Sequence, residues 1–151
     1  MPQASYLSVD RMNCLSVLAR APHDQLKRFA DKLIPDLGEI QVIENRTGLV
    51  MLPMSEPVKG TTFFLGEVLV AEARVRVNQV EGYAACLGRD VEQALALALI
   101  DAANAGGVAQ KKIAKFLAAQ SVNLEHADAE MLKQVEATRV EMETFEWLMP
   151  K

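Results

Sequence analysis

The sequence has few of the residues from which metal centres are built. Its 151 residues include only two histidines and two cysteines. His23 and His126 lie far apart, and Cys14 and Cys86 fit no Cys-x-x-Cys pattern, so neither a metal site nor an iron-sulfur cluster is expected within the chain. We interpret the histidines as exposed residues near helix ends and the cysteines as reduced, buried thiols.

Motifs that bind phosphate or carry a nucleophile are also missing. The chain has no Gly-x-x-x-x-Gly-Lys-Ser/Thr loop, no Gly-x-Gly-x-x-Gly, no Gly-x-Ser-x-Gly and no His-Glu-x-x-His. We therefore predict no catalytic residue and no cofactor for this chain by itself.

Basic charge and long apolar runs are scarce as well. The net charge of -4 argues against a nucleic-acid partner, because such proteins carry basic patches. The apolar run at residues 94–100 is far short of the roughly 20 residues that span a bilayer. Residues 1–10 carry no secretory signal. We expect a cytoplasmic protein with no membrane partner.

What the chain does contain is typical of one folded α+β domain over residues 1–151. Half of its residues are apolar and 24% are charged, which is the balance of a globular protein. Apolar residues three and four apart predict helices over residues 8–20 and 22–35, separated at Ala21-Pro22. The first third is therefore expected to be a helical hairpin.

Alternation with period two predicts an antiparallel sheet of about four strands. The expected strands cover residues 40–44, 49–54, 66–77 and 83–87. Turns are expected at residues 45–48 and at Glu81-Gly82. In the third strand one face is assigned to the core, and it consists of Glu67, Leu69, Ala71, Ala73, Val75 and Val77. The opposite face turns from apolar to charged along its length.

Helical spacing returns after Gly88, with helices expected over residues 91–103, 108–119 and 127–149. The first is apolar nearly all round, which predicts a central, buried helix. The last carries an apolar seam near period seven, made of Met131, Val135, Met142, Phe145 and Met149. This seam either packs on the chain's own sheet or docks in a partner's groove, and the residues leave both open. The C-terminal helices thus pack on the sheet or extend from it.

Arginines are the candidates for binding an anion. Arg74 and Arg76 share a predicted strand face with Glu72, where they either bind an anion or pair with opposite charges across the sheet. Arg89 precedes Asp90 at a predicted helix N-terminus, a place that can hold a phosphate. An Asp90 cap competes for the same amide groups. We favour ion pairs on the strand and a cap at Asp90.

Several segments, in order from Arg11 to Phe145, together resemble the PhnG family. They are residues 11–19, 47–50, 63–69 (Phe-Phe-Leu-Gly-Glu-Val-Leu), 73–75, 82–90, 98–102 and 137–141 (Ala-Thr-Arg-Val-Glu). None of them is a catalytic motif, so the specificity lies in their order and combination. The chain departs from the family at Met142, where an aromatic residue is common, and at residues 13–14, where the family has a tryptophan.

The resemblance implies the G subunit of the carbon-phosphorus lyase core complex, assembled with subunits H, I and J. With H, I and the ATP-binding-cassette-like L protein, that subunit is needed to transfer the ribose 5-triphosphate moiety of ATP to methylphosphonate with release of adenine. The chemistry belongs to subunits I and J, so an accessory chain is expected, with subunit I as chief partner and ATP and alkylphosphonate as substrates of the complex. The charges available to position the phosphonate are Arg74, Arg76, Arg89 and Arg139.

Two other functions stay open on the residues alone. One is a stand-alone enzyme that uses the face of Glu72, Arg74 and Arg76. The other is a homodimeric structural protein whose C-terminal helices pair with each other and that has no catalytic role.

Overall fold

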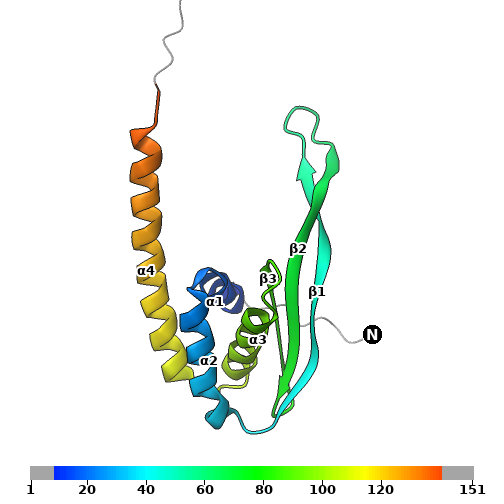
Figure 1. Ribbon diagram of the computed structural model, residues 1–151, viewed down its shortest axis with the longest axis vertical. Coiled ribbons are helices and arrows are strands. Elements are labelled where there is room, and N and C mark those ends of the chain that lie inside the picture. The colour runs from blue at the N-terminus through cyan, green and yellow to red at the C-terminus, as the bar shows by residue number, and fades with distance from the viewer. Residues whose placement is uncertain (1–8, 141–151) are drawn as a thin grey trace, which may run out of the picture.

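The computed structural model describes residues 9–140, in which helices from both ends of the chain lie on one side of a three-stranded antiparallel sheet of order β1-β2-β3 (Figure 1). The elements are α1 (Val9–Arg20), α2 (His23–Leu37), β1 (Ile40–Ser55), β2 (Thr62–Val77), β3 (Val80–Leu87), α3 (Val91–Ala105) and α4 (Gln110–Ala137). The predicted α+β class and antiparallel meander are confirmed. The sheet has three strands instead of about four.

The N-terminal helical hairpin is confirmed, with Pro22 at the N-cap of α2. Its second helix buries a stripe of Leu26, Ala30, Leu33 and Leu37. The predicted end at Pro35 is wrong, because α2 continues to Leu37. Pro35 lies in the last turn, where the loss of one backbone hydrogen bond is offset by the complete burial of Leu37.

The predicted turn at residues 45–48 is wrong, because β1 is one continuous strand. It pairs with β2 from Ile40 opposite Val77 to Ser55 opposite Thr62. Asn45-Arg46-Thr47-Gly48 favours a turn locally, but in the sheet each of these residues lies opposite a residue of β2. The backbone ladder along a 16-residue partner overrides the local preference.

The hairpin turns are at residues 56–61 and at Asn78-Gln79. In the first, the Glu56 carboxylate accepts hydrogen bonds from the N–H groups of Val58 and Lys59, both at 2.9 Å. In the second, Asn78 and Gln79 adopt φ values of 46° and 74°, the left-handed conformation of a tight hairpin turn.

Gly82, assigned above to a turn, instead lies inside β3 where the strand crosses α3. A Cβ atom at this position would stand 2.2 Å from the carbonyl oxygen of Ala98 and 2.6 Å from the amide nitrogen of Ala102. The glycine is therefore required by the close approach of two backbones and not by a turn.

The core lies between the sheet and the layer of helices, with α3 at its centre, as predicted. The β2 side chains at Ala71, Ala73, Val75 and Val77 are at most 2% exposed. Glu67 and Leu69, assigned to the same core face, are exposed, because they lie before the part of β2 that pairs with β3. The α3 residues that pack there are also small or aliphatic: Ala94, Leu97, Ala98, Ile100 and Ala102. Cys86 is buried in this core, whereas Cys14 is half-buried, so the expectation of two buried thiols holds for Cys86 alone.

The single helix α4 runs through residues that the sequence analysis divides between two helices, 108–119 and 127–149. The expected break at residues 121–126 is wrong, because the helix continues through this segment. The segment contains neither glycine nor proline. Within it, Ser121 Oγ donates to Glu125 Oε1 at 3.4 Å. The helix ends at Ala137, where the Thr138 N–H donates to the Val135 carbonyl at 3.1 Å. Residues 141–149 of the expected helix lie outside the described part of the chain.

A buried ion pair ties α1 to α3. Arg11 Nε and Nη2 donate to the two carboxylate oxygens of Asp101 at 2.6 and 2.5 Å. The Tyr83 N–H in β3 donates to the same carboxylate at 3.0 Å. The Asp101 side chain is only 1% exposed. Sequence analysis missed this residue, because nothing in the local pattern of α3 shows where its partners come from.

Within residues 9–140 no helix is long and apolar enough to cross a membrane.

We expect the substitution Gly82→Ala to lower the free energy of unfolding by about 2–3 kcal/mol, since the added methyl group forces β3 away from α3. Urea denaturation followed by circular dichroism measures the change. Gly66→Ala in β2 is the matched control, because no atom beyond its two chain neighbours lies within 4 Å of its Cβ position. Equal unfolding midpoints for the two variants would contradict the close-contact explanation.

Candidate partner-binding surfaces

The far half of the β1–β2 hairpin stands clear of the helices (Figure 1). The third strand pairs with β2 only from Val70 to Val77. Residues 49–55 and 62–69 therefore form a two-stranded ribbon with no third strand among the described residues. We call residues 49–69 the hairpin arm.

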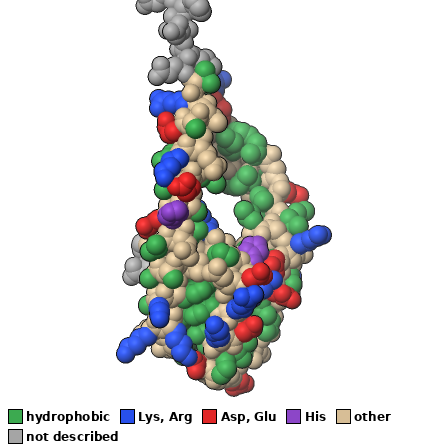
Figure 2. Space-filling model, turned by 60° about the vertical axis from the view of Figure 1, so that its left-hand side comes forward, with side chains coloured by type: hydrophobic (Ala, Val, Ile, Leu, Met, Phe, Trp, Pro, Cys, Tyr) green, Lys and Arg blue, Asp and Glu red, His purple; other side chains and the backbone are tan. Residues whose placement is uncertain are grey.

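The side chains of the hairpin arm are mostly large and apolar, and Figure 2 shows hydrophobic side chains gathered on this part of the molecule. Ten of them are between 42% and 85% exposed: Leu49, Val50, Met51, Leu52, Met54, Val58, Phe63, Phe64, Leu65 and Leu69. Neighbouring residues of a strand point to opposite faces, so both faces of the arm are apolar. A ribbon of this kind is stabilised when a partner covers it.

The outer face of the sheet next to the arm carries a charged network. Arg46 Nε lies 2.7 Å from Glu72 Oε1 and 2.9 Å from Glu44 Oε1. The Tyr83 hydroxyl donates to the other oxygen of Glu72 at 2.8 Å. The hydrogen bond from Arg46 is the main reason that the pKa of Glu72 lies below its ordinary value, and the Tyr83 hydroxyl lowers it further.

Arg74 and Arg76 lie on this same outer face. The Arg74 guanidinium stands 5.9 Å from the centroid of the Tyr83 ring. Arg76 Nη2 lies 2.6 Å from Glu81 Oε1. Pairing across the sheet is thus observed for Arg76, whereas Arg74 contacts an aromatic ring. Both side chains reach solvent at this face.

Asp90 caps α3, as the sequence favoured. Its Oδ1 accepts a hydrogen bond from the Gln93 N–H at 3.0 Å, and its Oδ2 lies 3.1 Å from Lys27 Nζ. The backbone hydrogen bond from Gln93 is the largest cause that lowers the pKa of Asp90. The amide position that an anion would use at this helix is therefore occupied by the chain's own carboxylate.

The four candidate arginines do not form one site. Arg74 lies opposite Tyr83, and the pairing of β2 with β3 runs from there to Val70 opposite Leu87. Arg76 lies opposite Glu81, near the start of β3, whereas Arg89 comes after Leu87, the last residue of β3. Arg76 and Arg89 therefore lie at opposite ends of this strand. Arg139 lies after the end of α4, where its Nη1 is 3.6 Å from Glu136 Oε2.

The second half of α4 forms another projecting element (Figure 1). Asp128 of α4 forms an ion pair with Arg20 of α1. Beyond Asp128 the large apolar side chains of α4 are exposed: Met131, Leu132 and Val135. Met131 is 65% exposed and Val135 is 59% exposed, so these two members of the predicted seam do not pack on the sheet. The other members, Met142, Phe145 and Met149, lie outside the described residues.

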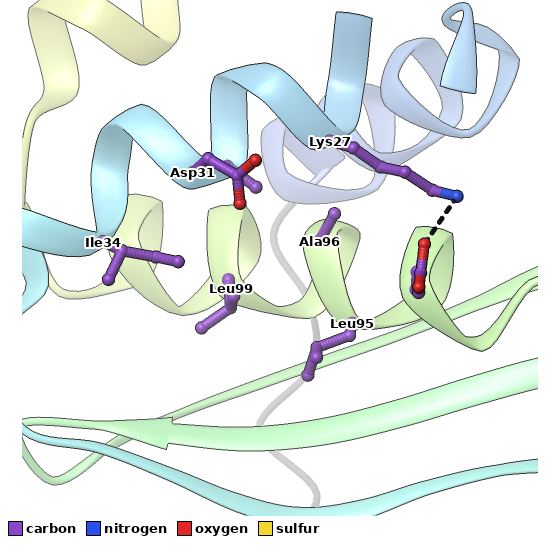
Figure 3. A pocket seen from close by; sticks show the side chains of 8 residues that line it. Lys27, Asp31, Ile34, Leu95, Ala96 and Leu99 are labelled. Carbon is purple, nitrogen blue, oxygen red and sulfur yellow. Dashed lines mark ion pairs between the residues drawn. The ribbon is translucent and has the colours of Figure 1, made fainter. Parts of the chain in front are cut away.

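A groove of about 350 Å³ separates α2 from α3 (Figure 3). Ile34, Leu95 and Leu99 line its apolar part. At one end Lys27 Nζ lies 3.1 Å from Glu92 Oε2. Both histidines are exposed, as expected, but only His23 lies near a helix end, since His126 lies in the interior of α4. The described residues include no group of three or more side chains placed to hold a metal ion.

Comparison with known proteins assigns the chain to a family. Residues 9–146 match the family described as phosphonate metabolism protein PhnG. This chain belongs to the PhnG family. A relative from Stutzerimonas stutzeri, provisionally named C-P lyase subunit protein HtxH, is 31% identical over 109 residues, which cover 63% of this chain and 29% of the relative. The matched segment thus spans less than a third of that relative.

This PhnG-family chain has two exposed apolar surfaces, the hairpin arm and the second half of α4. It also has a network of paired charges around Glu72. The sequence singled out Met131, Val135 and the arginines, but it missed the hairpin arm. The available signal was the strand segment from Phe63 to Val70, in which both alternating faces are apolar except at Glu67. A strand of a covered sheet also has this pattern, so the pattern alone did not show exposure.

We expect the substitution Asp90→Ala in this PhnG-family chain to lower the free energy of unfolding by about 1 kcal/mol at neutral pH, because α3 loses its cap. The folded-state pKa of Asp90 lies below its ordinary value, so the cap's pH-dependent contribution is complete above the unfolded-state pKa of 3.8. It is lost as the pH falls through the folded-state pKa.

Urea denaturation at a series of pH values, from neutral pH to below 3.8, measures the difference in the free energy of unfolding between Asp90→Ala and the unaltered chain. Asp90→Asn is the control, because its amide oxygen still accepts the Gln93 hydrogen bond but does not titrate. A difference that stays constant down to the most acidic pH would contradict the role of the charged carboxylate.

Proposed function

We propose that this chain is an accessory, non-catalytic subunit of the carbon-phosphorus lyase core complex. Membership of the PhnG family and the subunit name of the Stutzerimonas relative support the proposal. The single observation that carries it is the hairpin arm, whose exposed apolar side chains lie on both faces of an uncovered ribbon. Subunit I is the chief proposed partner, with H and J in the same assembly.

In this proposal the chain acts with subunits H, I and L in the transfer of the ribose 5-triphosphate moiety of ATP to methylphosphonate, with release of adenine. It contributes no cofactor and no nucleophile. Its contribution is to hold the partner's active site closed to water and to keep the phosphonate in position.

The shape of the chain supports a binding role. The core holds α1, α2 and α3 against the sheet, while the hairpin arm and the end of α4 extend past that core on opposite sides of the helical layer (Figure 1). A partner that lies between or around these projections covers far more apolar surface than one that meets a flat face. Burial of that surface is the main source of affinity in this proposal.

We expect the double substitution Phe64→Ser and Leu65→Ser to reduce co-purification with subunit I by at least about tenfold, which corresponds to about 1.4 kcal/mol. The free energy of unfolding of the isolated chain should stay within about 1 kcal/mol of the parent, because both side chains are about 60% exposed. Quantitative pull-down with tagged subunit I measures the first, and urea denaturation the second.

Leu87→Ser with Val122→Ser is the matched control, since both side chains are exposed apolar residues outside the arm. Equal loss of assembly in the two double variants would reject the arm as the contact. If the unaltered chain forms a stable homodimer and retains no subunit I, the homodimeric structural protein replaces the proposed function.

We further propose that one or more of Arg74, Arg76, Arg89 and Arg139 positions the phosphonate in the assembled complex. Each is reversed to Glu in turn, and the ratio of phosphonate transfer to plain ATP hydrolysis is measured in the reconstituted complex. Reversal of an arginine that positions the phosphonate should lower this ratio by about tenfold, because the new carboxylate repels the anionic phosphonate. Arg28→Glu, at an exposed position of α2, is the control. An unchanged ratio in all four variants would rule the arginines out.

A further inference from the structure

A second groove runs between α2 and α4. Its volume is about 590 Å³, and it is lined on one side by Phe29, Lys32 and Leu33 and on the other by Lys112, Lys115 and Phe116. We call it the lysine groove. It is separate from the hairpin arm and from the groove between α2 and α3 in Figure 3.

The floor of the lysine groove is apolar. The rings of Phe29 and Phe116 stack with their centroids 4.1 Å apart and their planes 4° from parallel. Leu33, which also lines the groove, is fully buried. Leu33 belongs to the buried core, and Phe29 and Phe116 pack against it.

The rims of the groove are basic. Lys112 Nζ lies 2.5 Å from Asp36 Oδ2, which is a pairing between the two walls. Lys32 and Lys115 are exposed, and neither forms an ion pair with another described residue. Figure 2 shows Lys and Arg side chains on both sides of a hydrophobic patch in this lower part of the molecule. This local positive charge stands out in a chain whose net charge is -4.

We propose that the lysine groove receives an amphipathic helix of another subunit, with apolar residues on Phe29 and Phe116 and carboxylates on Lys32 and Lys115. This inference rests on the proposed function, because it takes the chain to be a subunit. It adds the chemistry of the partner's segment: an apolar stripe flanked by Asp or Glu.

A helix fits the groove better than a small anion does. The α4 side chains at the groove are Lys112, Lys115, Phe116 and Ala119, which recur at the spacing of one helical face. Two helices that present such faces side by side leave a furrow into which a third helix packs. A free anion would meet the lysines but would leave the phenylalanine rings uncovered.

The charges decide which helix enters. An acidic partner meets opposite charge at both rims, whereas a basic one is repelled, so the lysines act on specificity and on the rate of association. The stacked rings of Phe29 and Phe116 supply the apolar contact. Exposed ion pairs are screened by salt, so assembly at this groove should weaken as the salt concentration rises.

The test uses the assembled complex of this chain with its lyase subunits and a water-soluble carbodiimide, which joins a lysine amine to a carboxylate in direct contact. We expect Lys32 and Lys115 to be joined to Asp or Glu of another subunit, as identified by mass spectrometry of the digested complex. Lys111 is the internal control, because it is exposed on the same helix but does not line the groove. It should remain unjoined.

A second measurement compares charge reversal at matched positions. Lys32→Glu with Lys115→Glu should weaken assembly at least tenfold at low salt, whereas Lys111→Glu should leave it unchanged and Lys32→Arg with Lys115→Arg should retain it. Circular dichroism of each isolated variant confirms that these exposed positions leave the fold intact.

The outcomes separate two failures. If the unaltered chain does not assemble with the lyase subunits, the proposed function fails and this inference fails with it. If the complex forms but Lys32 and Lys115 react no more than Lys111, or are joined to Glu141, Glu143 or Glu146 of this chain or of a second copy, only the assignment of the groove is overturned.

Discussion

The buried carboxylate of Asp101 holds three elements in one arrangement. It accepts two hydrogen bonds from Arg11 in α1 and one from the Tyr83 N–H in β3, while its own helix α3 runs through the centre of the core. A buried charge is tolerated only when such partners surround it, so α1 and β3 are both held in register with α3. The close contact of Gly82 with Ala98, one turn before Asp101, brings the strand near enough for the Tyr83 hydrogen bond.

This central arrangement explains why the rest of the chain projects. Once α3, with α1 and α2 behind it, covers the apolar face of β2 from Ala71 to Val77, no described element is left to cover the far half of the hairpin. Likewise α4 contributes Ile113 to the core near its start, and no other helix or strand within residues 9–140 lies beside its last turns. This chain is thus built as a small core with two apolar projections.

Local sequence predicted those elements whose neighbours lie close in the chain. The helical hairpin, the core face of β2 from Ala71 to Val77 and the Asp90 cap depend on spacing within one helix or strand or on a single turn, and all three are observed. The wrong predictions are those in which a distant partner decides. Residues 45–48 favour a turn alone but form strand because β2 lies beside them, and Gly82 marks a contact with a helix that begins nine residues later at Val91.

For the interaction surfaces the division is the same. The sequence by itself determined the α+β class, an acidic chain without phosphate or metal motifs, and, through the order of its segments, the resemblance to the PhnG family. Only the tertiary structure decided that the Phe63–Val70 segment is exposed and that Lys32 and Lys115 face each other across an apolar groove. Period and spacing report which residues share a face of one element, whereas exposure depends on which other elements cover that face.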